Sequence, residues 1–205
     1  MQLTELNRLL GNIDIYLLDQ ILKGRFTSDM KIFDAGCGEG RNAIYFLNTG
    51  FQVFGIDANE TAIQYIRYVS KTLKPEYDSH RFQVGKLEEI PFHSTAFDAV
   101  ICSAVLHFAE DERNFWEMMN EILRVLKPGG IFWFRMTTAF GGMKEESKEL
   151  GGGKYLLPDG TDRFLLTQEH VDKLLEKGFR FLETPKSVLV HGQRTMGVFV
   201  FEKIS

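Results

Sequence analysis

The sequence predicts an α/β fold in which a mostly parallel sheet carries helices on both faces. Short apolar runs alternate with stretches of helical periodicity, no segment repeats, and the first apolar run leads directly into a glycine-rich turn. Such alternation of strand and helix is typical of a doubly wound, Rossmann-like sheet. With 205 residues, 44% of them hydrophobic, the chain is long enough for one domain with a sizeable core.

The predicted strands are short apolar runs bounded by glycine, proline or charged residues. One of them, Ala99–Ala104, is apolar throughout, which fits a strand buried on both faces. The expected strands are Lys31–Ala35, Gln52–Ile56, Arg81–Val84, Ala99–Ala104, Ile131–Met136, Phe179–Glu183 and Val198–Glu202.

The predicted helices have apolar residues at spacings of three and four. Asn59 is placed to cap one of them, and Lys-Pro-Gly-Gly after Leu126 and Gly178 are expected to end two others. The expected helical segments are one or two helices within Leu3–Ile21, then Arg41–Leu47, Asn59–Leu73, Asp111–Leu126 and Thr167–Lys177.

Composition argues against several kinds of partner. The net charge of -4 leaves no basic excess for a nucleic-acid backbone. The longest stretch without charged residues, Asn42–Ile56, contains several polar side chains, so no membrane span is expected. The first 20 residues lack the features of a secretory signal, which favours the cytoplasm, and no pair of histidines has a metal-binding spacing. A monomer or a homodimer is expected.

The glycine turn Asp34-Ala-Gly-Cys-Gly-Glu-Gly40 is the first candidate for a binding site. In doubly wound sheets ligands bind at the carboxyl ends of the strands, and glycines allow a ligand to approach the backbone. Asp57 ends the second strand, where a carboxylate can accept both hydroxyls of a ribose. Arg41 replaces the third glycine of the dinucleotide fingerprint. A nucleoside is therefore favoured over a dinucleotide, and a nicotinamide-dependent oxidoreductase is disfavoured.

Five segments in order resemble the class I S-adenosylmethionine-dependent methyltransferases over about residues 30–135. They are IFDAGCGEGRNAIYFL, VFGIDAN, FQVGKLEEIPF, FDAVICSAVLHF and LRVLKPGG. GCGEGRN and the tail RTMGVFVFEK are also similar to tellurite-resistance-type small-molecule methyltransferases. The resemblance implies a seven-stranded sheet whose last strand is antiparallel. It also implies S-adenosylmethionine as cofactor and S-adenosylhomocysteine as product.

The resemblance also implies roles for residues at the ends of the strands. Asp34 would hold the methionine amino group through water, and Asp57 would bind the ribose. The family often has an acidic residue on the adenine amine where this chain has Lys86, which cannot accept a hydrogen bond. Adenine recognition is therefore expected from the Leu87 backbone or from Glu88. The full set of expected cofactor-binding residues is Asp34, Gly36, Cys37, Gly38, Arg41, Asp57, Ala58, Leu87, Glu88, Cys102 and Ser103.

Two residues are candidates for the chemistry. His107, just past the fourth strand, is the best-placed base, although a packed structural histidine is the alternative. Arg135 interrupts an apolar strand at its carboxyl end, and its alternative is a structural ion pair. Methyl transfer to a thiol or another soft nucleophile needs no base, because such groups ionise easily.

The glycine-rich connection Thr137–Leu166 is expected to be a substrate lid, with a plain surface excursion as its alternative. Tyr16 on the N-terminal helix is a further candidate, or else packs in the core. The expected substrate-binding residues are Tyr16, Tyr155, Arg163 and Arg194.

The sequence is thus interpreted as a single-domain methyltransferase that acts on a small molecule by in-line displacement. A protein that binds the cofactor without catalysis and a methyltransferase that acts on a macromolecule stay open as alternatives. The expected parts are an N-terminal helical cap over residues 1–28, a cofactor-binding core over 29–135, a lid over 136–166, and a last helix with closing strands over 167–205.

Overall fold

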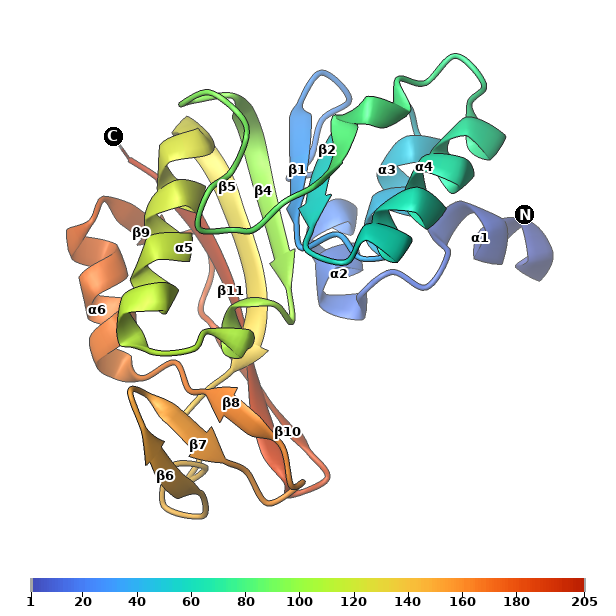
Figure 1. Cartoon of the computed structure of the whole chain (residues 1–205). Coiled ribbons are helices and arrows are strands. Elements are labelled where there is room, and N and C mark those ends of the chain that lie inside the picture. The colour runs from blue at the N-terminus through green and yellow to red at the C-terminus, as the bar shows by residue number, and fades with distance from the viewer. Residues whose placement is uncertain (1, 205) are drawn as a thin grey trace.

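A seven-strand path forms the centre of the molecule, in the order β10-β11-β5-β4-β1-β2-β3 (Figure 1). The computed structural model describes residues 2–204. The strands from β3 to β5 are parallel, and β11 is antiparallel to β5. This confirms the predicted fold class. The strands of the path are β1 (Lys31–Ala35), β2 (Gln52–Asp57), β3 (Phe82–Val84), β4 (Phe97–Ser103), β5 (Leu126–Thr137), β10 (Lys186–Val190) and β11 (Arg194–Lys203).

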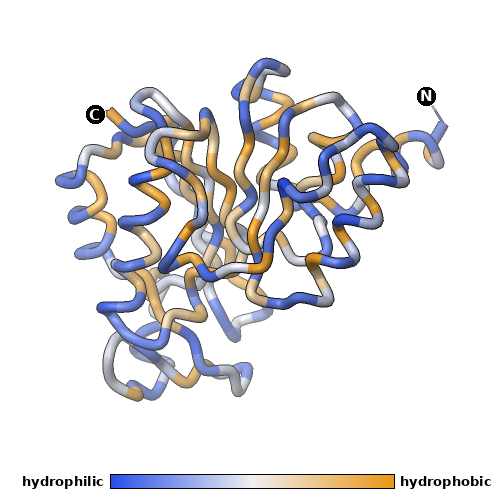
Figure 2. Tube along the Cα trace, turned by 45° about the horizontal axis from the view of Figure 1, so that its top comes forward, coloured by the Kyte–Doolittle hydropathy of each residue, from blue (hydrophilic) through white to orange (hydrophobic). Residues whose placement is uncertain are grey.

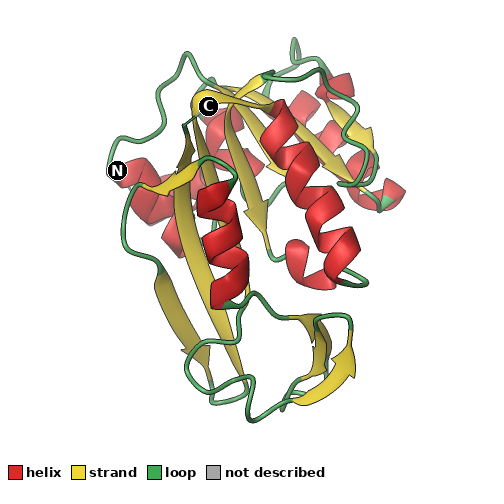
Figure 3. Cartoon of the chain, turned by 90° about the vertical axis from the view of Figure 1, so that its left-hand side faces the viewer, coloured by secondary structure: helices red, strands yellow, loops and turns green. Residues whose placement is uncertain are grey.

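Helices cover both faces of this sheet (Figure 3). The N-terminal helices α2, α3 and α4 pack on one face, and α5 and α6 pack on the other. Asn59 caps α4 as predicted, since its side chain accepts hydrogen bonds from the backbone of Thr61 and Ala62. The helices are α1 (Leu3–Leu10), α2 (Ile15–Leu22), α3 (Ala43–Asn48), α4 (Glu60–Leu73), α5 (Glu112–Val125) and α6 (Gln168–Glu176), with short 3-10 turns η1 (Ser79–Arg81) and η2 (Leu106–Phe108).

The core lies on the two faces of the central strands, where hydrophobic residues are concentrated (Figure 2). In β5 the side chain of Trp133 belongs to the layer under α2, α3 and α4, whereas Phe132 and Phe134 belong to the layer under α5 and α6. Phe134 stacks on Phe199 of β11 with ring centroids 4.8 Å apart. The aromatic residues of β5 therefore pack in the core on both faces of the sheet.

Three expectations about individual elements were wrong. The segment Phe179–Glu183 forms only the three-residue β9 (Phe179–Phe181), and the strand beside the longer part of β11 is β10, which the sequence analysis missed. Helix α3 begins at Ala43 rather than Arg41. The Lys-Pro-Gly-Gly segment belongs to the start of β5, because α5 already ends at Val125.

The predicted lid contains a second, three-stranded antiparallel sheet, made of β6 (Lys148–Gly151), β7 (Lys154–Leu156) and β8 (Asp162–Phe164). It lies beyond the carboxyl end of β5 (Figure 1). Phe164 is fully buried and stacks on Phe115 of α5 at 4.7 Å between ring centroids. The small sheet is therefore packed against the main body through β8.

Within residues 2–204 no helix combines the length and the apolar character that a bilayer crossing requires. The same part of the chain contains no group of three or more His, Cys, Asp or Glu side chains arranged to hold a metal ion.

Candidate cofactor and acceptor site

The glycine turn after β1 is held against the end of β2 by its own backbone. The amides of Gly36 and Cys37 both donate to the carbonyl of Ile56, each at 2.9 Å. Gly36 has a φ of +78°, and a Cβ at this position would clash with the Val105 side chain. Glycine is therefore required here for both the conformation and the close approach.

Asp57 is fixed by the same turn. Its Oδ2 accepts a hydrogen bond from the Gly38 amide at 2.8 Å, and its Oδ1 accepts one from the Asn59 amide at 2.8 Å. Each carboxylate oxygen has a second lone pair. The carboxylate is thus positioned by the backbone and keeps acceptor capacity for hydroxyl groups of a ligand.

Asp34 lies beneath the turn, at the end of β1. Its residue is only 2% exposed, and its Oδ2 has no hydrogen-bond partner among the described residues. Burial, together with the charge of Asp57, raises the pKa of Asp34 to about 7. A buried acceptor without a donor is costly, so this atom indicates a place for a ligand donor.

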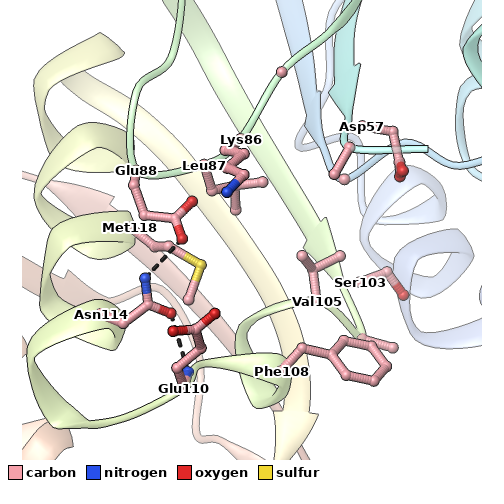
Figure 4. A pocket seen from close by; sticks show the side chains of 14 residues that line it. Asp57, Lys86, Leu87, Glu88, Ser103, Val105, Phe108, Glu110, Asn114 and Met118 are labelled. Carbon is pink, nitrogen blue, oxygen red and sulfur yellow. Dashed lines mark hydrogen bonds between the residues drawn. The ribbon is translucent and has the colours of Figure 1, made fainter. Parts of the chain in front are cut away.

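A cleft of about 470 Å³ opens at this carboxyl edge of the sheet. Figure 4 shows Asp57 on one side of it and Glu88, Asn114 and Met118 on the other, with Lys86 and Leu87 between them. Glu88 accepts a hydrogen bond from Asn114 at 2.6 Å. The lining residues are Gly36, Asp57, Ala58, Gly85, Lys86, Leu87, Glu88, Ser103, Ala104, Val105, Phe108, Glu110, Asn114 and Met118.

The structure brings six of the expected cofactor-binding residues to the cleft wall and leaves five off it. Those on the wall are Gly36, Asp57, Ala58, Leu87, Glu88 and Ser103. Asp34 and Cys102 lie beneath the wall, and the Cys37 side chain packs toward Gly55 in the core. Burial raises the pKa of both thiols. Their expected roles involve backbone atoms and stay predictions.

Arg41 is not among the residues that line the cleft, and its guanidinium is engaged elsewhere. Its Nε donates to the Asn12 carbonyl at 2.6 Å, and its Nη2 lies 3.8 Å from the carboxylate of Asp14. The helix that follows the turn starts two residues later than expected, so Arg41 stands on the turn and faces the N-terminal segment. This side chain therefore ties two loops together.

Val105, Phe108 and two residues of α5 line the cleft but were not predicted from the sequence, which pointed only to His107 in this region. Val105 and Phe108 come from the segment after β4, and Asn114 and Met118 lie on the first turns of α5. The last two are four residues apart, which places them on one helix face. That spacing, at the start of the first α-helix after β4, is the signal that could have found them.

Arg135 makes the ion pair that was left open as its alternative. Its Nη1 lies 2.8 Å from Oδ2 of Asp14, which is buried and caps α2. The guanidinium also lies over the Tyr16 ring, 5.5 Å from its centroid. Asp14 was not predicted as a site residue, and its partners are separated from it by up to 121 positions.

His107 lies in η2, next to the cleft residues of that turn. The residue is 6% exposed, its ring packs against Phe108 at 4.6 Å, and its Nδ1 has no partner within residues 2–204. Burial, followed by the charges of Arg163, Arg194 and Arg135, lowers the pKa of His107 to about 3. The ring is therefore neutral near pH 7.

Of the remaining substrate candidates, one is a core residue and two are arginines with partners near the surface. Tyr155 is buried in a small apolar cluster with Met143, Leu157 and Leu165, as a packing residue. Arg163 of β8 lies over the Phe108 ring, 4.7 Å from its centroid, and Arg194 of β11 pairs with Asp159 at 3.2 Å. Arg163 thus contacts η2, whereas Arg194 contacts the loop between β7 and β8.

Comparison with known proteins agrees with this geometry. A family model described as "Methyltransferase domain" matches residues 33–134, which include the glycine turn, Asp57 and the end of β4. The chain belongs to the class I S-adenosylmethionine-dependent methyltransferase family. The cofactor of this family is S-adenosylmethionine. The narrower resemblance to tellurite-resistance-type enzymes stays a prediction.

Individual relatives match over part of their length. The putative methyltransferase YqeM of Bacillus subtilis is 31% identical over 111 residues, which are 54% of this chain and 43% of that protein. The chain spans less than half the length of the first curated relatives it matches.

Solved structures show the same fold. An S-adenosylmethionine-dependent methyltransferase from Methanosarcina mazei superimposes with a TM-score of 0.73 at 22% identity, over 90% of this chain and 97% of the other. The 1,6-didemethyltoxoflavin-N1-methyltransferase of Burkholderia thailandensis does so with a TM-score of 0.69 at 18% identity, over 95% and 80%. The latter structure holds its acceptor and S-adenosylhomocysteine.

The residues present fit the family's cofactor. Asp34 offers a buried carboxylate oxygen without a donor, and Asp57 offers fixed acceptors. Gly38 has a φ of +50° and open space where a Cβ would stand. Asp34 could accept from an ammonium group, and Asp57 could accept from a pair of ribose hydroxyls. The glycine turn leaves room for a ligand to approach its backbone closely.

Proposed function

We propose that this protein transfers a methyl group from S-adenosylmethionine to a small-molecule acceptor. The observation that carries the proposal is the buried Asp34 Oδ2, which has no hydrogen-bond partner within residues 2–204 and lies beside a cleft that Asp57 lines. A buried acceptor of this kind is stabilised by a cationic donor such as an amino group.

In this proposal each end of the cleft binds a different part of the cofactor. Asp34 holds the amino end, and the glycine turn admits the ligand close to the backbone. Asp57 accepts the ribose hydroxyls, and Ala58 and Leu87 pack beside the base. Glu88 is positioned by Asn114 through one oxygen, so its other oxygen is the acceptor we expect for the adenine amine in place of the absent acidic residue at Lys86.

When bound, the cofactor supplies a methyl group that its sulfonium charge has already activated. The protein then needs to align the acceptor and exclude water. Val105, Phe108 and Met118 contribute apolar surface for this purpose. A histidine with a pKa of about 3 is a weak base, so we expect His107 to accept a hydrogen bond from the acceptor rather than to remove a tightly held proton.

The surroundings of the cleft support a small acceptor. The small sheet contacts η2 through the stacking of Arg163 on Phe108, which covers one side of the approach. The Burkholderia relative, of the same fold, is described with a small bound acceptor.

Calorimetric titration with S-adenosylmethionine, S-adenosylhomocysteine and NADH tests the proposal. We expect binding of the first two only. Asp57→Ala should weaken it by about 1.5–3 kcal/mol, as for a hydrogen bond to a charged group. Asp98→Ala is the matched control, because Asp98 pairs with Lys127 at the opposite end of the sheet. Binding of NADH, or equal affinity in Asp57→Ala, would contradict the proposal.

A further inference from the structure

Three arginines from three different strands lie toward η2, the turn that carries His107: Arg163 stacks on Phe108, the carbonyl of Arg135 accepts from the Ala104 amide at 2.7 Å, and Arg194 pairs with Asp159 just before β8. Arg135 comes from β5, Arg163 from β8 and Arg194 from β11. Each of their positive charges contributes to the lowered pKa of His107, so all three lie within electrostatic reach of its ring. We call Arg135, Arg163 and Arg194 the arginine cluster.

The carboxylates near the arginine cluster do not balance its charge. Asp14 pairs with Arg135 at 2.8 Å but is also 3.8 Å from Arg41, so one carboxylate serves two guanidinium groups. Asp159 pairs with Arg194 at 3.2 Å. Arg163 has no carboxylate within salt-bridge distance in residues 2–204, and its Nη1 donates to the carbonyl of Asp162. Positive charge is therefore in excess.

Polar atoms of this region are also left without partners. Nε of Arg135 and Nε of Arg194 are buried and unpaired among the described residues, as is Nδ1 of His107. Both Nε atoms carry a proton that can only be donated. Unsatisfied buried donors beside excess positive charge match an anion with several acceptor oxygens.

The position of the arginine cluster connects it to the cleft. Arg135 pairs with Ser103 in the register of β4 and β5, and Ser103 lines the cleft. Arg163 lies over Phe108, which also lines it. A group held by the cluster would thus lie next to the end of the cleft formed by Ser103, Val105 and Phe108.

We propose that the arginine cluster binds an oxyanion group of the methyl acceptor, so that the acceptor is a small carboxylate- or phosphate-bearing molecule. That the bound anion belongs to the methyl acceptor rests on the proposed function, whereas the anion site itself rests on the contacts described above. Guanidinium groups bind such oxyanions through paired hydrogen bonds. An anion here would also offset the charges that lower the pKa of His107.

Two probes, malonate and inorganic phosphate, test the site without knowledge of the acceptor. Each is titrated into the free protein and into the protein saturated with S-adenosylhomocysteine, at constant ionic strength, and followed by calorimetry and by the arginine Nε–H signals in NMR spectra. We expect saturable binding of at least one probe, with shifts at the signals of Arg135 and Arg194. The two probes separate a carboxylate site from a phosphate site. Failure of both to bind overturns the inference.

Variants locate the anion. Arg163→Gln and Arg194→Gln should each weaken probe binding about tenfold or more, whereas Arg180→Gln, which removes an exposed arginine paired with Glu202, should leave it unchanged. Arg163→Lys should restore part of the affinity, because the charge returns without the fork. Equal weakening in Arg180→Gln would show a nonspecific charge effect and overturn the inference.

The two proposals fail separately. Absence of S-adenosylhomocysteine binding contradicts the proposed function but leaves the anion titrations of the free protein valid. Binding of S-adenosylhomocysteine without either probe contradicts the inference alone. In an acceptor screen with labelled cofactor, acids should be methylated in preference to their amides, and the reverse order overturns the inference.

Discussion

The two halves of the carboxyl edge of the sheet carry opposite charge. The cleft at β1, β2 and β4 is bordered by Asp34, Asp57, Glu88 and Glu110, and among the described residues that line it Lys86 is the one basic side chain. The neighbouring ends of β5, β8 and β11 bring the arginine cluster together. Charge thus changes sign along this edge, in the order that a cationic cofactor and the proposed anionic acceptor would require.

The halves are also built differently. Backbone amides fix Asp57 in the acidic half, at a turn that glycine conformations define. In the basic half, long side chains from distant segments reach one another, and Asp14 holds Arg135. The acidic half is therefore organised by local chain geometry, whereas the basic half depends on tertiary packing.

The largest effect is expected on stability, when the carboxylate that holds Arg135 in the basic half is removed. Asp14→Ala should lower the free energy of unfolding by about 3 kcal/mol, because it leaves Arg135 unpaired and removes the cap of α2. Urea unfolding measures it. Asp98→Ala breaks a more exposed pair and should cost less than about 1 kcal/mol. Similar losses in both variants would contradict the difference between the halves.

The second prediction concerns the pH dependence of cofactor binding in the acidic half. The pKa of Asp34 is about 7 in the free protein, and an ammonium group binds its ionised form. Affinity for S-adenosylhomocysteine should therefore rise between pH 6 and pH 8, level off above that, and fall about tenfold per pH unit below pH 7. Calorimetry in two buffers of different ionisation enthalpy should detect proton release on binding.

Asp34→Asn is the matching variant. It should weaken binding by about 1.5–3 kcal/mol at pH 8 and make the affinity almost independent of pH over this range. An unchanged pH profile in Asp34→Asn would assign the titration to another group.

The smallest effect is expected when a carboxylate is introduced at position 86, at the adenine end of the cleft. Lys86→Asp should tighten cofactor binding by a few-fold, since it adds an acceptor for the adenine amine, and a few-fold change corresponds to under about 1 kcal/mol. Glu88→Gln gives the comparison, because it weakens the acceptor already there. Weaker binding in Lys86→Asp would mean that the lysine makes its own contact with the cofactor.

Much of the fold could be predicted because the central strands are buried on both faces. A strand that is buried on both faces has a nearly continuous apolar sequence, which can be recognised directly. The predicted strand Lys31–Ala35, for example, coincides with β1. The edge strand β10 was missed because its apolar run, Val188–Val190, is only three residues long, and its residues alternate between exposed and half-buried positions. The strands of the small sheet are three or four residues long and lie among glycines, so they leave no pattern.

The site divides in the same way. Residues at strand ends, such as Asp57 and Ser103, could be placed on the cleft because strand ends meet at one edge. The partner of Arg135 could not be found, since Asp14 is 121 positions away and no local spacing links them. Arg41 was misplaced because its direction depends on where α3 begins.

The way in which the small sheet joins the body has a consequence for how such a protein can diversify. The chain leaves at Thr138 and returns at Leu166, where the two residues form a β-bridge, and Ala139 donates to the Leu166 carbonyl at 2.9 Å. The two ends of the inserted segment are thus neighbours whatever lies between them, and loop length changes the closure cost only slowly. We expect that the part of the segment before Phe164, which includes Arg163, can differ in length and charge while the cofactor half keeps its framework, because Phe164 itself packs on Phe115 in the core.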